Sequence, residues 1–279
     1  MLRTSSGLTQ DKINKLLGSV GDMALKRRAR RILEEFGLKD KDEILEVGCG
    51  NGYYLSLLNR LKKSVKLTGI DNDTSALRDA KIFINDKRVK IILSSAEALP
   101  FKNNSFDKVI MSEVIEHVNN EKKTLQEIYR VLRKDGTLVL TTCNINYPFL
   151  WDPINYILQH FFGTHIKSGF WAGIWNQHQR LYTQNAIRKL VEDSGLKIEK
   201  LEPLTFWCLP FNHYIVNLIA KLFYSNKLPK SFAKGINKFQ NNKQPFFVKL
   251  GFNLINKFDS LNDLFPRKSG VSIFVKAVK

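Results

Sequence analysis

A strand-like run that ends in an acidic residue and opens into a glycine turn is the strongest chemical signal in the chain. The run is ILEVGCGNG, in which Glu46 precedes Gly48, Gly50 and Gly52. Glycine is needed where the backbone bends sharply and a ligand approaches it closely, because a Cβ would fill the space. The turn therefore predicts a ligand site, and the alternative is an ordinary turn in a generic α/β protein.

Two acidic side chains narrow the chemistry of that ligand. Glu46 stands two positions before the first glycine, where it suits a cationic group better than a pyrophosphate, which it would repel. The next strand-like run, KLTGID, ends in Asp71, where a carboxylate can accept both hydroxyls of a ribose. Together they indicate a nucleoside that carries an ammonium group and no phosphate.

The elements that must position these residues follow an alternating pattern. From residue 43 onward, short β-rich runs alternate with helical patterns, which is typical of a mostly parallel sheet wrapped by helices. The runs are, in order, EILEV, YYLSLLNRL, KLTGI, TSALRDAKIFI, VKIILS, FDKVIMS, KKTLQEIYRVL and TLVLTT. Before them, apolar residues at helical spacing predict one or two helices over 11–37 that cover the core and stop at Gly37.

The pattern changes after Thr142. The sequence predicts an aromatic-rich loop that extends to Trp175, and then a helix, TQNAIRKLVEDSG, capped by Thr183. Residues 196–207 and the final run VSIFVKAVK are expected to add strands.

Four motifs in order between Ile44 and Thr142 resemble those of the class I S-adenosylmethionine-dependent methyltransferases. The resemblance is to the small-molecule branch that includes ubiquinone and menaquinone methyltransferases. ILEVGCGNG is similar to the first motif, GIDND to the second, and SSAEALPFKNNSFDKVIMSEVIEHV and RVLRKDGTLVLTT to the segments that follow. The resemblance implies a Rossmann-like, doubly wound α/β fold with a mostly parallel seven-stranded sheet. It also implies S-adenosyl-L-methionine as the cofactor and methyl transfer to a small-molecule or lipidic acceptor.

The resemblance also implies which residues hold the cofactor. Glu46 and the glycines would face its methionine part, Asp71 the ribose, residues 95–97 the adenine, and residues 113–117 the methyl-transfer end. Many relatives carry Asp where Ser95 stands, so the contact with the adenine amino group would pass to Ser95 or to a water. The full predicted cofactor site is Glu46, Gly48, Cys49, Gly50, Gly52, Asp71, Asn72, Ser95, Ala96, Glu97, Glu113, Val114 and His117.

No residue is assigned as catalytic from the sequence. Should the acceptor be a hydroxyl or an acidic carbon, the weak candidates for a base are His117 and, in the segment WNQHQRLYT, His178 and Tyr182. Each also has a structural explanation as a packing or capping residue. Cys143 is expected to be a core or loop thiol, since the chain lacks the Pro-Cys pair that RNA cytosine-5 methyltransferases carry after the fourth strand.

Composition bounds the class of protein. With 279 residues and 43% hydrophobic content, the chain can bury a full α/β core and a smaller second module. Its three cysteines are widely separated, which predicts neither a disulfide framework nor a metal site and favours a cytoplasmic protein. No signal peptide and no apolar run of about 18 residues is recognisable.

The net charge of +18 is concentrated near the C-terminus, since residues 203–279 hold 12 basic and 2 acidic residues. Two apolar-basic segments, 211–224 and 246–258, predict amphipathic helices that form a lid or a dimer face, or that bind an anionic membrane surface peripherally. We therefore expect a helical cover (1–43), a cofactor-binding core (44–207 and 270–279) and a basic insertion (208–269). Alternative functions are an RNA methyltransferase, although nucleic acid is the less favoured partner, and a noncatalytic cofactor-binding module. The oligomeric state and the acceptor stay unpredicted.

Overall fold

Seven strands form one sheet in the computed structural model, which describes residues 9–18, 20–61, 64–208, 211, 214, 253 and 256–279. The sheet has the order β3-β2-β1-β4-β5-β7-β6, in which β5, β7 and β6 pair antiparallel and all other neighbours pair parallel. This confirms the predicted doubly wound, mostly parallel α/β fold. The strands are β1 (Glu43–Val47), β2 (Lys66–Asp71), β3 (Lys90–Leu93), β4 (Phe106–Ser112), β5 (Leu132–Cys143), β6 (Lys197–Leu204) and β7 (Ser272–Val278).

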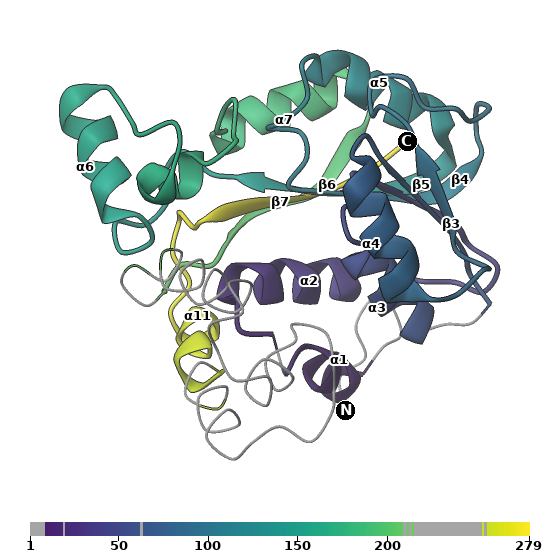
Figure 1. Cartoon of the computed structure of the whole chain (residues 1–279), viewed down its shortest axis with the longest axis horizontal. Helices are drawn as coiled ribbons and strands as arrows, with labels where there is room; N and C mark the ends of the chain where they lie inside the picture. Colours follow the sequence, from purple (N-terminus) through teal and green to yellow (C-terminus); the bar gives the residue numbers. More distant parts are fainter. Residues whose placement is uncertain are drawn as a thin grey trace.

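Helices cover both faces of this sheet. In Figure 1, α5 (Glu121–Val131) and α7 (Gln184–Asp193) lie on one face, and α2 (Met23–Glu35) and α3 (Tyr53–Leu61) lie on the other. Helix α4 (Thr74–Ile84) packs against α3 and the β2–β3 edge. The central strands are apolar on both sides, as in β1, where Ile44, Leu45 and Val47 are fully buried.

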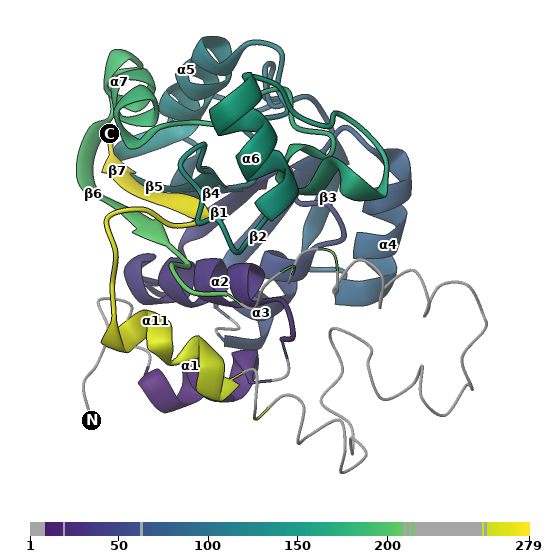
Figure 2. The same cartoon turned by 90° about the vertical axis from the view of Figure 1, so that its left-hand side faces the viewer.

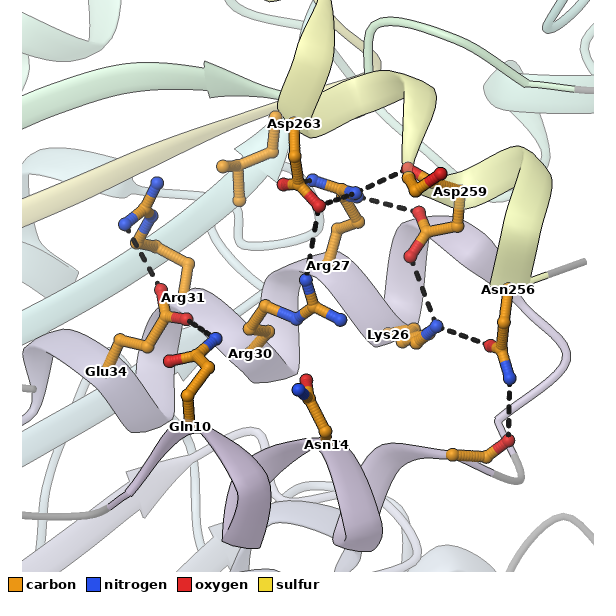
Figure 3. Close-up of a pocket in the computed structure, with 13 residues that line it drawn as sticks. Gln10, Asn14, Lys26, Arg27, Arg30, Arg31, Glu34, Asn256, Asp259 and Asp263 are labelled. Atoms are coloured by element: carbon orange, nitrogen blue, oxygen red, sulfur yellow. Dashed lines mark hydrogen bonds and ion pairs between the residues drawn. The ribbon is translucent and has the colours of Figure 1, made fainter. Parts of the chain in front are cut away.

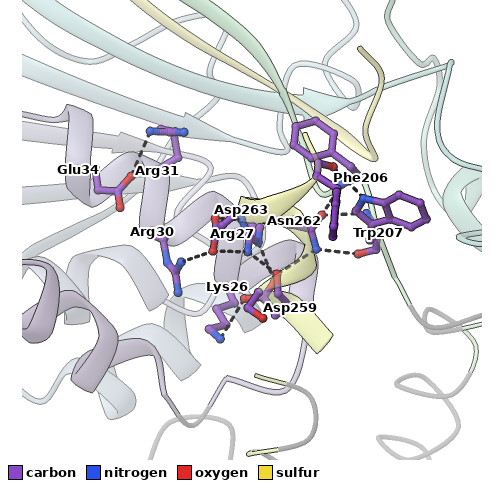
Figure 4. A network of polar contacts seen from close by, with 12 residues as sticks. Lys26, Arg27, Arg30, Arg31, Glu34, Phe206, Trp207, Asp259, Asn262 and Asp263 are labelled. Atoms are coloured by element: carbon purple, nitrogen blue, oxygen red, sulfur yellow. Dashed lines mark hydrogen bonds and ion pairs between the residues drawn. The ribbon is translucent and has the colours of Figure 1, made fainter. Parts of the chain in front are cut away.

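The N-terminal segment forms two helices, α1 (Gln10–Leu17) and α2, in agreement with the prediction for 11–37. Residues 256–264, which include α11 (Leu261–Leu264), lie beside them (Figure 2). Buried charges join the two segments. Arg27 Nε donates to Asp259 Oδ1 over 2.7 Å, and Lys26 Nζ lies 3.1 Å from the other Asp259 oxygen. Arg27 and Arg30 also pair with Asp263 (Figure 4).

A cavity of about 540 Å³ lies between α1, α2 and residues 256–263. Figure 3 shows that Arg30, Arg31 and Glu34 border it from α2, with Gln10 and Asn14 opposite on α1. None of the residues of the predicted cofactor site lines it.

The segment after β5 departs from the sequence prediction. Where an aromatic-rich loop was expected, the structure has α6 (Pro153–Phe162) and the 3-10 helix η1 (Phe170–Trp175). Asp152 caps α6 by accepting from Asn155 N over 3.1 Å, and Gly163 ends it in the left-handed region with φ 62°. These are ordinary start and stop signals, so the loop prediction was wrong because the aromatic content masked them.

Other expectations for the C-terminal half can be placed only in part. Thr183 caps α7 as predicted, since its Oγ1 accepts from Ala186 N over 3.1 Å. The amphipathic segments at 211–224 and 246–258 fall almost entirely outside the described residues, so the boundaries of the basic insertion stay a prediction. Within the described part of the chain, we find no helix that is both long enough and apolar enough to span a bilayer.

Candidate functional site

The predicted cofactor residues meet at the carboxyl ends of β1, β2, β3 and β4. Strand β1 lies between β2 and β4. The chain adds β2 and β3 on one side of β1 and then crosses back to add β4 and β5 on the other side. Open α/β sheets bind ligands at such a switch point, where the loops on either side diverge. Asp71 ends β2, and the glycine turn, the 94–97 segment and Glu113 follow β1, β3 and β4.

The three glycines of the turn serve different purposes. A Cβ on Gly48 would clash with the Val114 side chain, and one on Gly52 would lie 2.6 Å from Ile84 Cδ1, so both glycines allow close packing. Gly50 differs, because it has φ 49° and no described atom lies within 4 Å of the position of a Cβ. The turn is thus open at Gly50, which fits the close approach of a ligand.

Asp71 ties the turn to the neighbouring strands. Its Oδ2 accepts from Gly50 N over 2.8 Å, and its Oδ1 accepts from Asp73 N over 3.0 Å. Its carbonyl oxygen accepts from Ser94 N over 3.0 Å, which brings the 94–97 segment alongside. A carboxylate can accept about four hydrogen bonds, so Asp71 retains capacity for ribose hydroxyls.

Glu46 lies beneath the turn rather than at its surface. It is 3% exposed, and its Oε2 accepts from Leu55 N over 3.0 Å, which caps the first turn of α3. Burial, together with the nearby charge of Asp71, raises the pKa of Glu46 well above its ordinary value. A bound ammonium group would favour the charged form, so the contact with a methionine moiety stays a prediction.

At the predicted adenine end, the side chains form hydrogen bonds with the protein itself. Ser95 is exposed, and its Oγ accepts from Glu97 N over 3.1 Å. Glu97 Oε1 accepts from Asn119 N over 2.9 Å and from Asn120 N over 3.2 Å. Glu97 therefore holds the turn that precedes α5. Asn72 is exposed and Ala96 half-buried at the same edge of the sheet, and their contact with adenine stays a prediction.

Glu113 begins the loop after β4 in a left-handed conformation, with φ 55°. Its Oε2 lies 3.3 Å from Arg28 Nη1 and accepts from Cys143 Sγ over 3.2 Å. Its Oε1 is buried and has no hydrogen-bond partner among the described residues. A buried carboxylate oxygen is normally paired, so this atom faces a place where a ligand group would bind.

The sequence prediction missed Arg28, which reaches this site from α2. Ala24 and Ile32 lie one turn before and after it on the same, buried face of the helix. The sequence did hold a signal for Arg28, which is a charged residue among the apolar positions of an amphipathic helix. Although burial disfavours its charge, the carboxylate of Glu113 keeps the pKa of Arg28 above its ordinary value.

Glu116 lies next to Glu113 and is fully buried. Its Oε2 accepts from Thr142 Oγ1 over 2.9 Å, and its Oε1 lies 3.9 Å from His178 Nε2. Burial and the nearby charge of Glu113 raise the pKa of Glu116 to about 8. Two carboxylates in one buried place are unfavourable unless a cation is close.

The histidine candidates come together, whereas Tyr182 does not join them. The rings of His117 and His178 are 4.7 Å apart, and His117 Nδ1 lies 3.0 Å from Gln177 O. Tyr182 donates to Glu121 Oε1 over 2.8 Å, which fits the capping alternative for this residue. From the WNQHQRLYT segment, His178 is the side chain that faces Glu116.

All three cysteines are free and buried. Burial, together with the negative charges of Glu113 and Glu116, raises the pKa of Cys143 well above its ordinary value. Burial also raises the pKa of Cys208 to about 12. A thiolate nucleophile at Cys143 is therefore disfavoured in this structure, which supports the expectation of a core or loop thiol.

Comparison with known proteins identifies the same region. Residues 45–140 match the family described as "Methyltransferase domain". The mitochondrial ubiquinone biosynthesis O-methyltransferase of Rattus norvegicus is 32% identical over 178 residues, which cover 62% of this chain and 48% of that protein. The ubiquinone/menaquinone biosynthesis C-methyltransferase of Campylobacter jejuni is 32% identical over 137 residues, which cover 47% and 57%. The chain thus spans about half the length of these relatives.

Solved structures extend the likeness to most of the chain. A methyltransferase described as putative, from Bacillus halodurans, superposes with a TM-score of 0.55 at 20% identity. The superposition covers 90% of this chain and 98% of that one. At this identity the likeness establishes the fold, and the site must be argued from its own residues.

Proposed function

We propose that the chain, in which residues 45–140 match a methyltransferase domain, transfers the methyl group of S-adenosylmethionine to a small-molecule or lipidic acceptor. The observation that supports the proposal best is the open glycine turn at Gly50 beside Asp71, at the switch point of the sheet. A glycine turn with open backbone, beside a carboxylate that can accept from ribose hydroxyls, fits a nucleoside such as this sulfonium cofactor.

In this proposal the residues of the chain mainly bind and orient. Bound S-adenosylmethionine supplies a methyl group on a sulfonium that is already a good leaving group. Gly50 and Asp71 would position the nucleoside, while the loop that begins at Glu113 would bring the acceptor into line. An acceptor hydroxyl must also lose a proton, and His117 and His178 are the candidates nearest to that step.

The aromatic side chains next to Cys143 would offer an apolar wall to a flat acceptor such as a quinone-like ring. Tyr147, Trp151 and Trp175 pack with Cys143 in a buried aromatic cluster beyond the end of β5. Two of the relatives are named for ubiquinone or menaquinone biosynthesis, one as an O-methyltransferase and the other as a C-methyltransferase. Both names refer to quinone biosynthesis, so they support a quinone-like ring as the class of acceptor.

We also propose that the protein binds an anionic membrane surface, and the described residues favour α6 as the point of contact. Helix α6 projects beyond the layers of the sheet (Figure 1). Phe161 is 76% exposed and Phe162 70%. Asp152, the one acidic residue between 149 and 171, is fully buried. Exposed aromatic rings without surface acids are typical of interfacial segments.

The proposed activity is tested in two steps. Calorimetry should show binding of S-adenosylmethionine and S-adenosylhomocysteine by the full chain, and the absence of heat with both would remove the proposal. Incubation with labelled cofactor and hydroxylated or demethylated quinols should then give labelled lipid-soluble product. Binding without product from any acceptor would instead support the noncatalytic alternative.

A further inference from the structure

Three side chains with metal-ligand chemistry converge beside the proposed methyl-transfer site. Glu116 follows β4, Cys143 ends β5, and His178 precedes α7. One ligand atom from each, a carboxylate oxygen, Sγ and an imidazole nitrogen, lies within 4.8 Å of the other two. Because these residues are far apart in the sequence, their spacing predicted no metal site.

Glu116 gives independent evidence for a ligand. Its side chain is fully buried, and Oε2 is satisfied by the Thr142 hydroxyl. Its Oε1 is also buried, yet it accepts no hydrogen bond from the described residues. Buried carboxylates are normally paired with a cation or coordinate a metal, so this oxygen is the expected contact for one.

The orientation of His178 fits metal binding. Its Nδ1 is hydrogen-bonded to the carbonyl oxygen of Ile174, an atom that can only accept. Nδ1 must therefore carry the proton, and in the neutral ring the lone pair is on Nε2, which lies 3.9 Å from Glu116 Oε1. A backbone carbonyl that fixes the second ring nitrogen in this way is the usual support of a metal-ligating histidine.

A divalent cation would balance the charges that these residues carry once a metal is bound, because ligands must lose their protons to coordinate it. Two carboxylates, Glu113 and Glu116, share this buried place, and Arg28 offsets one of them. Ionisation of Cys143 would add a further negative charge, so that a dication would bring the cluster to neutrality. The set of one thiolate, one imidazole and one carboxylate is typical of zinc rather than magnesium or calcium.

We propose that Glu116, Cys143 and His178 bind a Zn²⁺ ion whose fourth position is open to the acceptor. Zinc bonds of about 2.0 to 2.3 Å place tetrahedral ligand atoms about 3.5 Å apart, so small side-chain rotations would close the present spacing. On binding, a Zn–S bond forms and the Cys143 proton leaves to solvent. His178 is the most exposed of the three ligands, with 16% of its side chain exposed, whereas Glu116 is fully buried and Cys143 is 5% exposed.

The role of the ion rests on the proposed function, whereas its binding does not. An acceptor hydroxyl that coordinated Zn²⁺ would have a lowered pKa and would lose its proton to solvent near neutral pH. The oxygen is then a better nucleophile toward the cofactor's methyl group.

The test uses the full purified chain, stripped with a chelator and titrated with Co²⁺ and Zn²⁺. We expect one Co²⁺ per chain, with a near-ultraviolet sulfur-to-cobalt charge-transfer band that Zn²⁺ abolishes in competition. C143S should lose that band, and H178Q and E116Q should weaken Co²⁺ binding at least tenfold. The control C208A removes another buried thiol and should keep the band unchanged.

Two outcomes would overturn the proposal: no stoichiometric Co²⁺ binding by the folded chain, or a sulfur band that survives in C143S. Circular dichroism of each variant identifies loss of fold, and E116Q keeps the shape of the side chain in case C143S is unstable. Calorimetry with S-adenosylhomocysteine separates the two claims, since cofactor binding without Co²⁺ binding removes only the metal site. Co²⁺ binding without cofactor binding removes only the proposed function.

Discussion

At the scale of single residues, the predicted cofactor site combines open backbone at the glycine turn with acidic side chains that also bind the protein's own backbone. Glu46, Asp71 and Glu97 each accept hydrogen bonds from backbone N–H groups, and so they shape the loops as well as any ligand contact. Mutation of these acids would change both roles at once. Gly50 is the cleaner probe, because its contribution is the space that it leaves open.

We predict that Gly50→Ala weakens S-adenosylhomocysteine binding by tenfold or more, measured by calorimetry. The added methyl group would occupy the space needed by the ligand, and an L-residue at positive φ also costs about 1 kcal/mol locally. Gly163→Ala is the matched control, since Gly163 has φ 62° and the same open surroundings at the end of α6. Equal losses in the two variants would mean that backbone strain, not ligand space, is responsible.

The sequence predicted four loops that meet at the ends of strands, because each is a local motif, and their contact with the cofactor stays a prediction. It missed Arg28, and it gave no link between Cys143 and His178, because these depend on which helix crosses which strand end. The Arg28 contact arises only when α2 packs over β5 and β7. The contact between Cys143 and His178 arises because the segment before α7 pairs with the end of β5, where Tyr182 N donates to Cys143 O. Local patterns therefore specified the cofactor loops, while the acceptor side required tertiary structure.

At the scale of elements, the docking of residues 256–264 on α2 depends on buried charges. Lys26, Arg27 and Asp259 are each less than 10% exposed. We predict that Asp259→Ala lowers the free energy of unfolding by about 3 kcal/mol, since it leaves two buried cations without their shared partner. Urea denaturation followed by circular dichroism measures this.

Asp193→Ala is the comparison for that variant. Asp193 pairs with Lys189 on the exposed surface of α7, where their side chains are 51% and 78% exposed. Its loss should cost less than about 0.5 kcal/mol. Similar costs for Asp193 and Asp259 would show that the buried network does not hold residues 256–264 in place.

Helix α5 provides a pH-dependent prediction. Arg130 donates to both oxygens of Glu127, Leu99 N donates to one of them, and these bonds hold the pKa of Glu127 below its ordinary value. A carboxyl group with a depressed folded-state pKa stabilises the protein above its unfolded pKa, about 4.3, and the effect disappears as pH falls through the folded value. Glu127→Gln should thus unfold more easily than wild type at pH 7, with the difference shrinking toward pH 3. Denaturation curves that stay equally separated at all pH values would contradict this.

Most elements were predictable because their patterns are strong and local. The alternation from residue 43 onward predicted every parallel strand, and Thr183 marked the start of α7. The strand order was not predictable from the chain, because β7 enters between β5 and β6 from the far end of the sequence. Helix α6 was not predicted, although Asp152 and Gly163 mark its ends. Its aromatic residues do not lie on one buried face of the helix, so they gave no helical pattern of buried apolar positions.

At the scale of the whole molecule, the described residues place the apolar protrusion on the side of the proposed acceptor site. Asp152, which caps α6, accepts from Ile174 N in η1, and the carbonyl of Ile174 in turn holds His178. An acceptor dissolved in the lipid would therefore leave the membrane close to His178 and the proposed acceptor site. This connection favours α6 as a membrane contact that also serves the active site.

We predict that full-length protein co-sediments with vesicles that contain anionic lipid, and that the double variant Phe161→Ser with Phe162→Ser reduces the bound fraction at least tenfold. Burial of an exposed Phe in lipid contributes about 1.5–3 kcal/mol, so two rings decide most of the affinity. Ile82→Ser is the matched control, since Ile82 is 77% exposed on α4, away from this protrusion. Binding that persists in the double variant but disappears at high salt would instead place the contact in the basic residues of 203–279, because charge-driven binding is screened and ring insertion is not.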